Sequence, residues 1–211
     1  MRLPHNPALR FVVCFAFWYA ALLFSWPITG QAYCATFRAV GTLIYGRIDR
    51  NKEITFEAYS QGWHSHYTRV VIVNPAKMKP DGSGPVRNLD LDTRAFGWMP
   101  LALLLALVLA TPLPWKRRGR ALLWGFIFQQ TFVILALGYC IWNESTEVGL
   151  VSLSEPGKEA AAAVKNMLAG QLTAAVPVLI WILTTFRRED LQKISEFLTE
   201  KKPNRSSKII H

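Results

Sequence analysis

The stretch PLPWKRRGRALLWG, residues 112–125, places four cations in five positions between two long apolar runs. The run before these cations, 96–115, has no charged residue, and neither does the run after them, 121–142. An α-helix rises about 1.5 Å per residue, so about 20 apolar residues cover the roughly 30 Å hydrocarbon core of a bilayer. The pattern predicts two membrane-spanning helices joined by a tight basic turn at 116–120. Because Lys and Arg gather in short cytoplasmic loops, this turn is predicted to lie inside the cell.

The composition agrees with a membrane protein. Of 211 residues, 51% are hydrophobic and 18% are charged, and the formal net charge is +10. Nucleic-acid-binding proteins also carry such a charge, but no DNA- or RNA-binding motif accompanies the basic residues here. The densest basic cluster lies between two apolar runs. The sequence therefore predicts that this cluster fixes the topology and meets anionic lipid, with no nucleic-acid partner; its members are Lys116, Arg117, Arg118 and Arg120.

Two further apolar runs complete the predicted set of membrane helices. The run 11–28 follows a short N-terminal segment, 1–10, and the run 171–186 ends at a pair of arginines. The first run could be a signal peptide, but the sequence after it offers no small-x-small cleavage site. We therefore expect an uncleaved first span. Four transmembrane helices follow, at 11–28, 96–115, 121–142 and 171–186.

The loop charges predict which side each segment occupies. With both termini inside, the cytoplasmic segments 1–10, 116–120 and 187–211 carry 2, 4 and 7 Lys and Arg. The outer segment 143–170, predicted as a loop and a helix, has two Lys against four Glu. The other outer segment, 29–95, exceeds the roughly 60 residues above which translocation becomes largely independent of charge. The sequence predicts a mainly α membrane protein, N-in and C-in.

The segment 29–95 has its own organisation. Apolar residues at helical spacing predict an amphipathic helix that continues after Pro27 and Gly30. Three strand-like stretches follow, at 54–59, 66–74 and 86–92, separated by residues typical of turns. We expect a small α+β extracytoplasmic insert with three short antiparallel strands. Such a sheet is too small for a large core of its own, so it should pack on the helices or on a partner.

Four residues of the outer segments suggest an enzymatic alternative: Cys34, His64, His66 and Arg94 could form a cysteine-peptidase constellation. A nucleophilic thiolate needs a neighbouring base or cation, and nothing in the spacing shows that these residues meet. His64 and His66 would share one face of a strand, which suits a metal ion, but no third ligand is apparent. The sequence therefore assigns no catalytic, metal or cofactor site. A membrane enzyme that uses Cys34 or the histidine pair is the alternative.

Polar and sulfur-bearing residues near the spans leave two questions open. The spans contain no ionisable Asp, Glu, Lys, Arg or His, which disfavours a proton-coupled transporter. Gln129 and Gln130 lie in the middle of the third span, where amides can hydrogen-bond between helices; a small permease built around them is a second alternative. Cys34 and Cys140 are predicted at similar depth on the oxidising side, either unpaired or joined in a disulfide.

The stretch NLDLDTRAFGWMPLALLLALVLATPLPWKRRGRALLWG, residues 88–125, carries a family resemblance. An outer Asn–Arg segment, a Gly-aromatic-x-Pro start to a span, an apolar run ending in ATP and a Trp-basic turn resemble the small membrane proteins encoded beside exosortases, of the class H exosortase-associated type. The resemblance implies a bacterial inner-membrane protein beside an exosortase, an enzyme that sorts proteins bearing a C-terminal Pro-Glu-Pro-type signal. The candidate partner contacts are Asn88, Arg94, Trp98 and Pro100.

The resemblance implies a supporting role in which the insert holds a partner or a sorted substrate. The chain lacks the exosortase pattern of a Cys followed by Ser-Gly near the end of a span, so we expect a non-enzymatic accessory subunit without a cofactor. Arg94 also has a simpler interpretation. It lies within two residues of the second predicted span, where its long side chain can extend to lipid headgroups.

Overall fold

The computed structural model describes residues 6–46, 53–59, 66–81, 83–150, 153–169 and 171–186. It is mainly helical and carries one three-stranded antiparallel sheet, as predicted. The N-terminal segment 1–5, the tail 187–211 and His64 lie outside the described residues. The longer elements are, in chain order, α1 (Pro7–Phe24), α2 (Trp26–Tyr45), β1 (Glu53–Ala58), β2 (Tyr67–Val73), β3 (Val86–Asp92), α3 (Met99–Ala110), α4 (Trp115–Glu147), α5 (Glu155–Ala169) and α6 (Gln171–Thr185). Two short helical segments, η2 (Pro75–Lys77) and η3 (Arg94–Trp98), complete the described elements.

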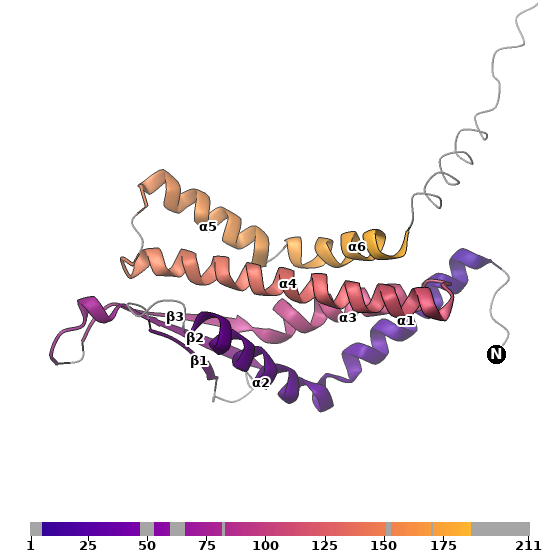
Figure 1. Cartoon of the computed structure of the whole chain (residues 1–211), viewed down its shortest axis with the longest axis horizontal. Helices are drawn as coiled ribbons and strands as arrows, with labels where there is room; N and C mark the ends of the chain where they lie inside the picture. Colours follow the sequence, from indigo (N-terminus) through magenta and orange to yellow (C-terminus); the bar gives the residue numbers. More distant parts are fainter. Residues whose placement is uncertain are drawn as a thin grey trace, which may run out of the picture.

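The first two helices meet at a sharp bend (Figure 1). The Asn6 side chain caps α1 by accepting a hydrogen bond of 3.0 Å from the backbone N–H of Ala8. The helix ends at Phe24, and α2 begins at Trp26 with Pro27 in its first turn. Proline has no N–H to donate to the preceding turn, so it suits the start of a helix better than its interior. The predicted second helix is present, but it begins before Pro27 and Gly30 rather than after them.

The predicted span 96–115 is shorter in the structure, and the turn after it lies elsewhere. Helix α3 ends at Ala110 and α4 begins at Trp115, so the connection is 111–114 and not 116–120. Pro112 disfavours a helical conformation for Thr111, whose ψ is 130°, and Pro114 is extended at the N-cap of α4. The four cations therefore lie in the first turns of α4. This helix of 33 residues also extends beyond both ends of the predicted span 121–142.

The sheet has the order β1-β2-β3 and packs on the helices, as predicted. The strands fall close to the predicted stretches, and Val70 of β2 pairs with Phe56 of β1 and Leu89 of β3. The buried face of the sheet meets the second half of α4 and the start of the η3–α3 helix. The core there contains Ile54, Val70, Ile72, Leu91, Phe96, Val133, Ala136, Leu137, Ile141 and Val148. The insert thus shares its core with the helical bundle rather than folding around one of its own.

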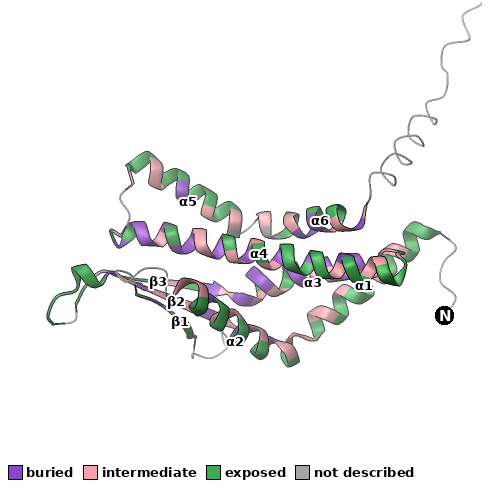
Figure 2. Ribbon diagram, in the orientation of Figure 1, coloured by how far each residue is buried: buried purple, intermediate pink, exposed green. Residues whose placement is uncertain are grey.

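Helix α4 runs along the molecule, with α5 and α6 on one side and the sheet and α2 on the other (Figure 1). Helix α3 packs against α1, α4 and α6, and a second core joins Leu104 and Val108 of α3 to Ala121 and Ile180. Burial concentrates in β2, α3 and one side of α4, whereas α1 contributes no buried residue (Figure 2).

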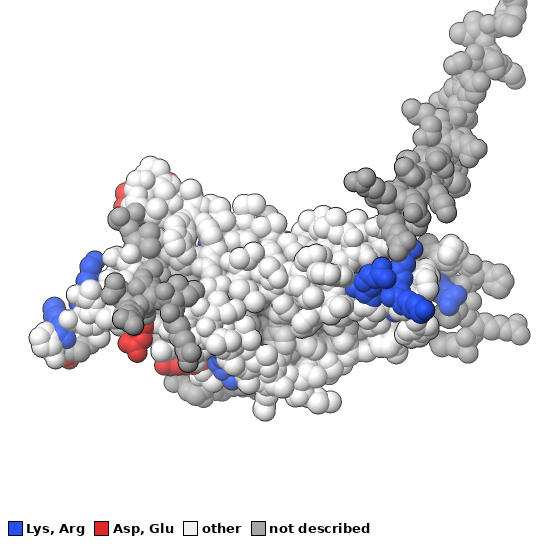
Figure 3. Space-filling model, in the orientation of Figure 1, with Lys and Arg blue, Asp and Glu red and all other residues white. Residues whose placement is uncertain are grey.

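Two described helices, α1 and α4, are long and apolar enough to cross a membrane. The apolar helical segments Arg94–Ala110 and Ala174–Thr185 are shorter. Charged residues lie toward the two ends of the visible face, and most of the surface between them is uncharged (Figure 3). Lys and Arg gather where α4 begins, and acidic residues appear only toward the end with the sheet and α5.

Candidate functional site

The candidate site lies where the insert joins the bundle, around the short π-helix η3 (Arg94–Trp98). Asp92, at the end of β3, starts this helix: its Oδ1 accepts hydrogen bonds from the backbone N–H groups of Arg94 at 2.9 Å and Ala95 at 3.1 Å. The buried Thr93 hydroxyl, 2.8 Å from the Thr68 hydroxyl, ties the same turn to β2. π-Helical turns are frequent at functional sites.

An aromatic cluster gathers around Trp26 at this junction. The Trp26 ring centroid lies 5.8 Å from that of Trp98, 6.3 Å from Tyr33 and 6.5 Å from His66. Tyr33 and Trp98 are themselves 5.5 Å apart, edge to face. The Arg94 guanidinium carbon lies 5.9 Å from the Trp26 ring centroid, within the range of a cation–π contact. Three segments distant in sequence thus build one amphipathic cluster.

Two glycines make this approach feasible. A Cβ at Gly30 would lie 2.8 Å from Cε2 of Trp26, which folds back over its own helix. A Cβ at Gly97 would collide with the Tyr33 hydroxyl and lie 3.1 Å from Cε1 of that ring. The glycine of the Gly-aromatic-x-Pro pattern therefore serves the packing of Tyr33 against η3.

Two polar atoms of the cluster, Arg94 Nε and Trp98 Nε1, are buried without a hydrogen-bond partner among the described residues, and both groups can only donate. Burial raises the pKa of Tyr33 to about 12 although the Gln130 side chain opposes the shift, so this hydroxyl also stays protonated. Buried polar groups nearly always have a partner, and an unpaired one costs about 1–3 kcal/mol. The cluster therefore holds donors that an acceptor could satisfy.

The structure brings Cys34 and His66 together, but not as a nucleophile and its base. Cys34 is 3% exposed, and its Sγ donates to the backbone carbonyl of His66 at 3.7 Å rather than to the imidazole. Burial raises the pKa of the Cys34 thiol despite the opposing charge of Arg38. The His66 Nε2 lies 3.9 Å from Asp92 Oδ1. This geometry holds a neutral thiol, whereas catalysis would need a thiolate.

The described part of the chain bears on the questions about metal ions and disulfides, although His64 of the histidine pair lies outside it. No group of three or more His, Cys, Asp or Glu side chains in that part could hold a metal ion. Cys14, Cys34 and Cys140 are free thiols, so the unpaired alternative for Cys34 and Cys140 is the one that the structure has.

Of the four candidate partner contacts, the structure brings two together. Arg94 and Trp98 share η3, whereas Asn88 is exposed on β3, opposite Val71 and six residues before Arg94. Pro100 is buried in the first turn of α3. Sequence reasoning missed Trp26 and Tyr33 as members of the site. Their spacing of seven residues on one helix, which places both on one face, is the signal that could have found them.

The basic cluster at the opposite end has two roles. Arg117 and Arg118 are half-buried and reach the ends of other helices: Arg117 Nη2 donates to the Thr185 carbonyl at 3.1 Å, and Arg118 Nη2 to the Thr111 carbonyl at 3.3 Å. Cations favour the C-terminal ends of helices, because the unpaired carbonyls there carry partial negative charge. Lys116 and Arg120 are exposed and remain available for lipid.

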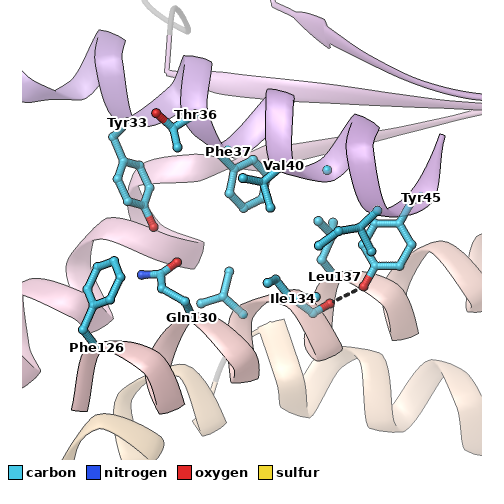
Figure 4. Close-up of a pocket in the computed structure, with 12 residues that line it drawn as sticks. Tyr33, Thr36, Phe37, Val40, Tyr45, Phe126, Gln130, Ile134 and Leu137 are labelled. Carbon is cyan, nitrogen blue, oxygen red and sulfur yellow. Dashed lines mark hydrogen bonds between the residues drawn. The ribbon is translucent and has the colours of Figure 1, made fainter. Parts of the chain in front are cut away.

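The two glutamines differ in their surroundings. Gln129 is fully buried, and neither its amide oxygen nor its nitrogen has a partner among the described residues, so the structure supports packing but not the expected interhelical hydrogen bond. Gln130 lines an apolar groove of about 280 Å³ between α2 and α4. The Tyr33 hydroxyl points toward its amide (Figure 4), and Tyr45 closes the other end by donating to the Ile134 carbonyl at 2.7 Å.

No protein-family model matches this chain, and neither a curated protein nor a solved structure was found to match it.

Proposed function

We propose that the chain is a non-enzymatic accessory subunit of an exosortase-type protein-sorting system in a bacterial inner membrane, and that its extracytoplasmic insert holds a partner or substrate. The observation that carries the proposal is the site at the base of the insert. It combines unpartnered buried donors with a protonated, carbonyl-bonded Cys34, so it is equipped to bind but not to attack.

Exposed apolar surface supports the membrane placement. Phe17 and Phe24 of α1 are 64% and 83% exposed, Leu123 of α4 is 58% exposed, and Leu183 of α6 is 76% exposed. Large apolar side chains in this number on neighbouring helices would be an aggregation hazard in water but suit contact with lipid. Together with the uncharged middle of the molecule (Figure 3), they favour a bilayer around α1, α3, α6 and the first half of α4.

The two shorter helices complete the proposed four spans. The continuous helix Arg94–Ala110 covers about 25 Å, and α6 covers about 22 Å. A span shorter than the bilayer is accommodated by local thinning or by flanking side chains that reach the interface. Both helices pack against α4 and against each other, and Arg117 holds the end of α6 at the proposed cytoplasmic side. The first half of α4 would then carry the basic cluster inside and leave the insert outside.

The role in sorting rests on the resemblance of residues 88–125. This segment contains the end of β3, η3, α3 and the start of α4, so it links the donor site at one end of the bundle to the basic cluster at the other. β3 is an edge strand of the sheet, and Asn88 is exposed on it. Edge strands offer unpaired backbone groups to an added strand. The proposed partner docks on this edge.

Genetic complementation separates a binding subunit from an enzyme. In a strain that lacks the chain, we would measure processing of a protein with a Pro-Glu-Pro-type C-terminal signal. Cys34→Ala should restore processing as well as the wild type does, because the thiol only fills space and donates to a carbonyl. An insert truncated at β3 should not restore it. Loss of processing in Cys34→Ala at unchanged protein level would favour the enzyme. Normal processing without the chain would refute the role in sorting.

A further inference from the structure

The Arg94 guanidinium carries an unsatisfied donor in a half-buried place: its Nε is buried and has no hydrogen-bond partner among the described residues. The carboxylate of Asp92, two residues earlier, is committed elsewhere: its Oδ1 accepts the backbone N–H groups of Arg94 and Ala95 and faces His66. The guanidinium does contact the Trp26 ring, which supplies a π face but no acceptor lone pair.

A second donor lies one helical turn further on. Trp98 Nε1 is buried and without a partner among the described residues, and its ring stacks within the cluster that contains Trp26. An indole N–H can only donate, and a guanidinium can only donate. An acceptor group with a negative charge is the kind of partner that both donors lack. Phosphate fits best, because Arg binds its oxygens in pairs with planar geometry.

The position of the cluster selects the source of that phosphate. Arg94 begins the helix that runs to Ala110, at the end of the bundle opposite to the basic cluster. Trp and Tyr side chains concentrate at the level of lipid headgroups, and Trp26, Tyr33 and Trp98 meet at this level if the bundle spans the membrane as proposed. Phospholipid headgroups bring phosphate to that depth.

We propose that Arg94 and Trp98, with the face of Trp26, form a specific site for the phosphate of a phospholipid headgroup in the outer leaflet. The site needs the membrane placement proposed above but not the role in sorting. It turns the general tendency of an interfacial Arg to reach headgroups into a defined contact with two donors and one aromatic wall. The bound lipid would fix the insert, through η3, at a set height above the bilayer.

Lipid binding by the purified full-length protein tests the proposal. The delipidated protein in a neutral detergent is titrated with phosphatidylglycerol, and bound lipid is counted by native mass spectrometry. Arg94→Gln should weaken binding about tenfold or more, as expected for loss of a charge-assisted contact. Trp98→Phe keeps an aromatic ring, removes only the N–H and should weaken binding about threefold or more. Arg87→Gln, the same charge change on exposed β3, should leave it within about twofold.

Competitors distinguish the possible ligands. Diacylglycerol with the same chains lacks the phosphate and should bind at least about tenfold more weakly than phosphatidylglycerol. Inorganic phosphate and a peptide with a free C-terminal carboxylate should not displace the lipid at millimolar concentration. Equal binding of diacylglycerol, or displacement by either competitor, would overturn the lipid-phosphate site, and so would unchanged binding by Arg94→Gln. If Arg94→Gln does not fold, Trp98→Phe decides. Failure of the sorting assay with lipid binding intact would count against the proposed function alone.

Discussion

Replacing Gly41 by Ala tests the contact that holds β1 against α2. A Cβ at this buried position would lie 2.6, 2.8 and 2.9 Å from three ring carbons of Phe56 in β1. Carbon atoms pack best at about 3.5–4.0 Å, so the ring or the helix must retreat by about 1 Å. Overpacking of this kind costs about 1–3 kcal/mol, whereas Ala gains up to about 1 kcal/mol over Gly in a helix interior. Subtracting the gain from the cost leaves a net destabilisation of up to about 2 kcal/mol.

Gly119 provides the matched control, because it is a helical glycine of α4 where an added Cβ would meet nothing within 4 Å. Gly119→Ala should gain helix propensity without a clash, and so stabilise by up to about 1 kcal/mol. Thermal unfolding in one detergent, followed by tryptophan fluorescence, should show opposite shifts, of about 2–4 °C per kcal/mol for a chain of this size.

A double variant locates the clash. Leu in place of Phe56 removes part of the ring that meets the new methyl group, so Gly41→Ala should cost less in a Phe56→Leu background than in the wild type. A Tm raised by Gly41→Ala to the same extent as by Gly119→Ala would refute the packing of α2 on β1. Equal costs of Gly41→Ala in both backgrounds would show that the strain lies elsewhere.

Four further outcomes follow from the polar side chains and the cysteines. Gln129→Leu should raise the Tm, by the equivalent of about 1 kcal/mol, because it removes a fully buried amide with no partner among the described residues; a lowered Tm would show that the amide is satisfied. Arg117→Ala should destabilise the protein by about 1–2 kcal/mol, because it loses the hydrogen bond to the Thr185 carbonyl. Lys116 is exposed, so Lys116→Ala should destabilise it by less than about 0.5 kcal/mol. Equal effects of the two variants would contradict the capping role of Arg117. Thiol labelling under denaturing, non-reducing conditions should find all three cysteines reactive, and a single reactive thiol would reveal a disulfide. In the native protein, burial raises the pKa of Cys34, so its alkylation should accelerate only above the usual thiol range, and fast labelling at neutral pH would contradict this environment.

Local signals predicted the sheet closely. The strand stretches 54–59, 66–74 and 86–92 correspond to β1, β2 and β3 within one residue at each end, because alternating apolar residues and flanking turn residues are local properties. The prediction that so small a sheet needs foreign apolar surface was also correct: Val133 and Leu137 of α4 complete its core.

The predicted position of the turn between α3 and α4 was wrong because it relied on charge and not on proline. The cations of 116–120 indicate the cytoplasmic side of the membrane, but they do not require a turn at these residues. Pro112 and Pro114 decide the backbone instead, and an α-helix tolerates Lys and Arg in its first turns when they reach carbonyls of other helices. The nearby carbonyl of Thr185, far away in sequence, was not foreseeable from the local pattern.

The candidate site was predicted only in part, because contacts between residues far apart in sequence are not visible in a local pattern. Arg94 and Trp98 came from one continuous stretch, whereas Trp26 and Tyr33 reach them through the bend between α1 and α2 and through two glycines that allow close approach. The spacing of Cys34 and His66 could not show that the thiol meets a backbone carbonyl rather than the imidazole. Tertiary geometry, rather than residue type, changes that pair from a catalytic candidate into a packing contact.

The proposed four-span bundle carries its insert and the Arg94 site on the outer side of the membrane. Fusions of a reporter that is active only outside the cytoplasm test this placement. Fusions after Arg94 and after Gly157 should be active, because these residues precede α3 and begin α5 on the proposed outer side. Fusions after Gly119, in the basic start of α4, and after Pro203 should be silent. Activity after Gly119 would place the basic cluster outside and contradict the four-span topology with both termini inside.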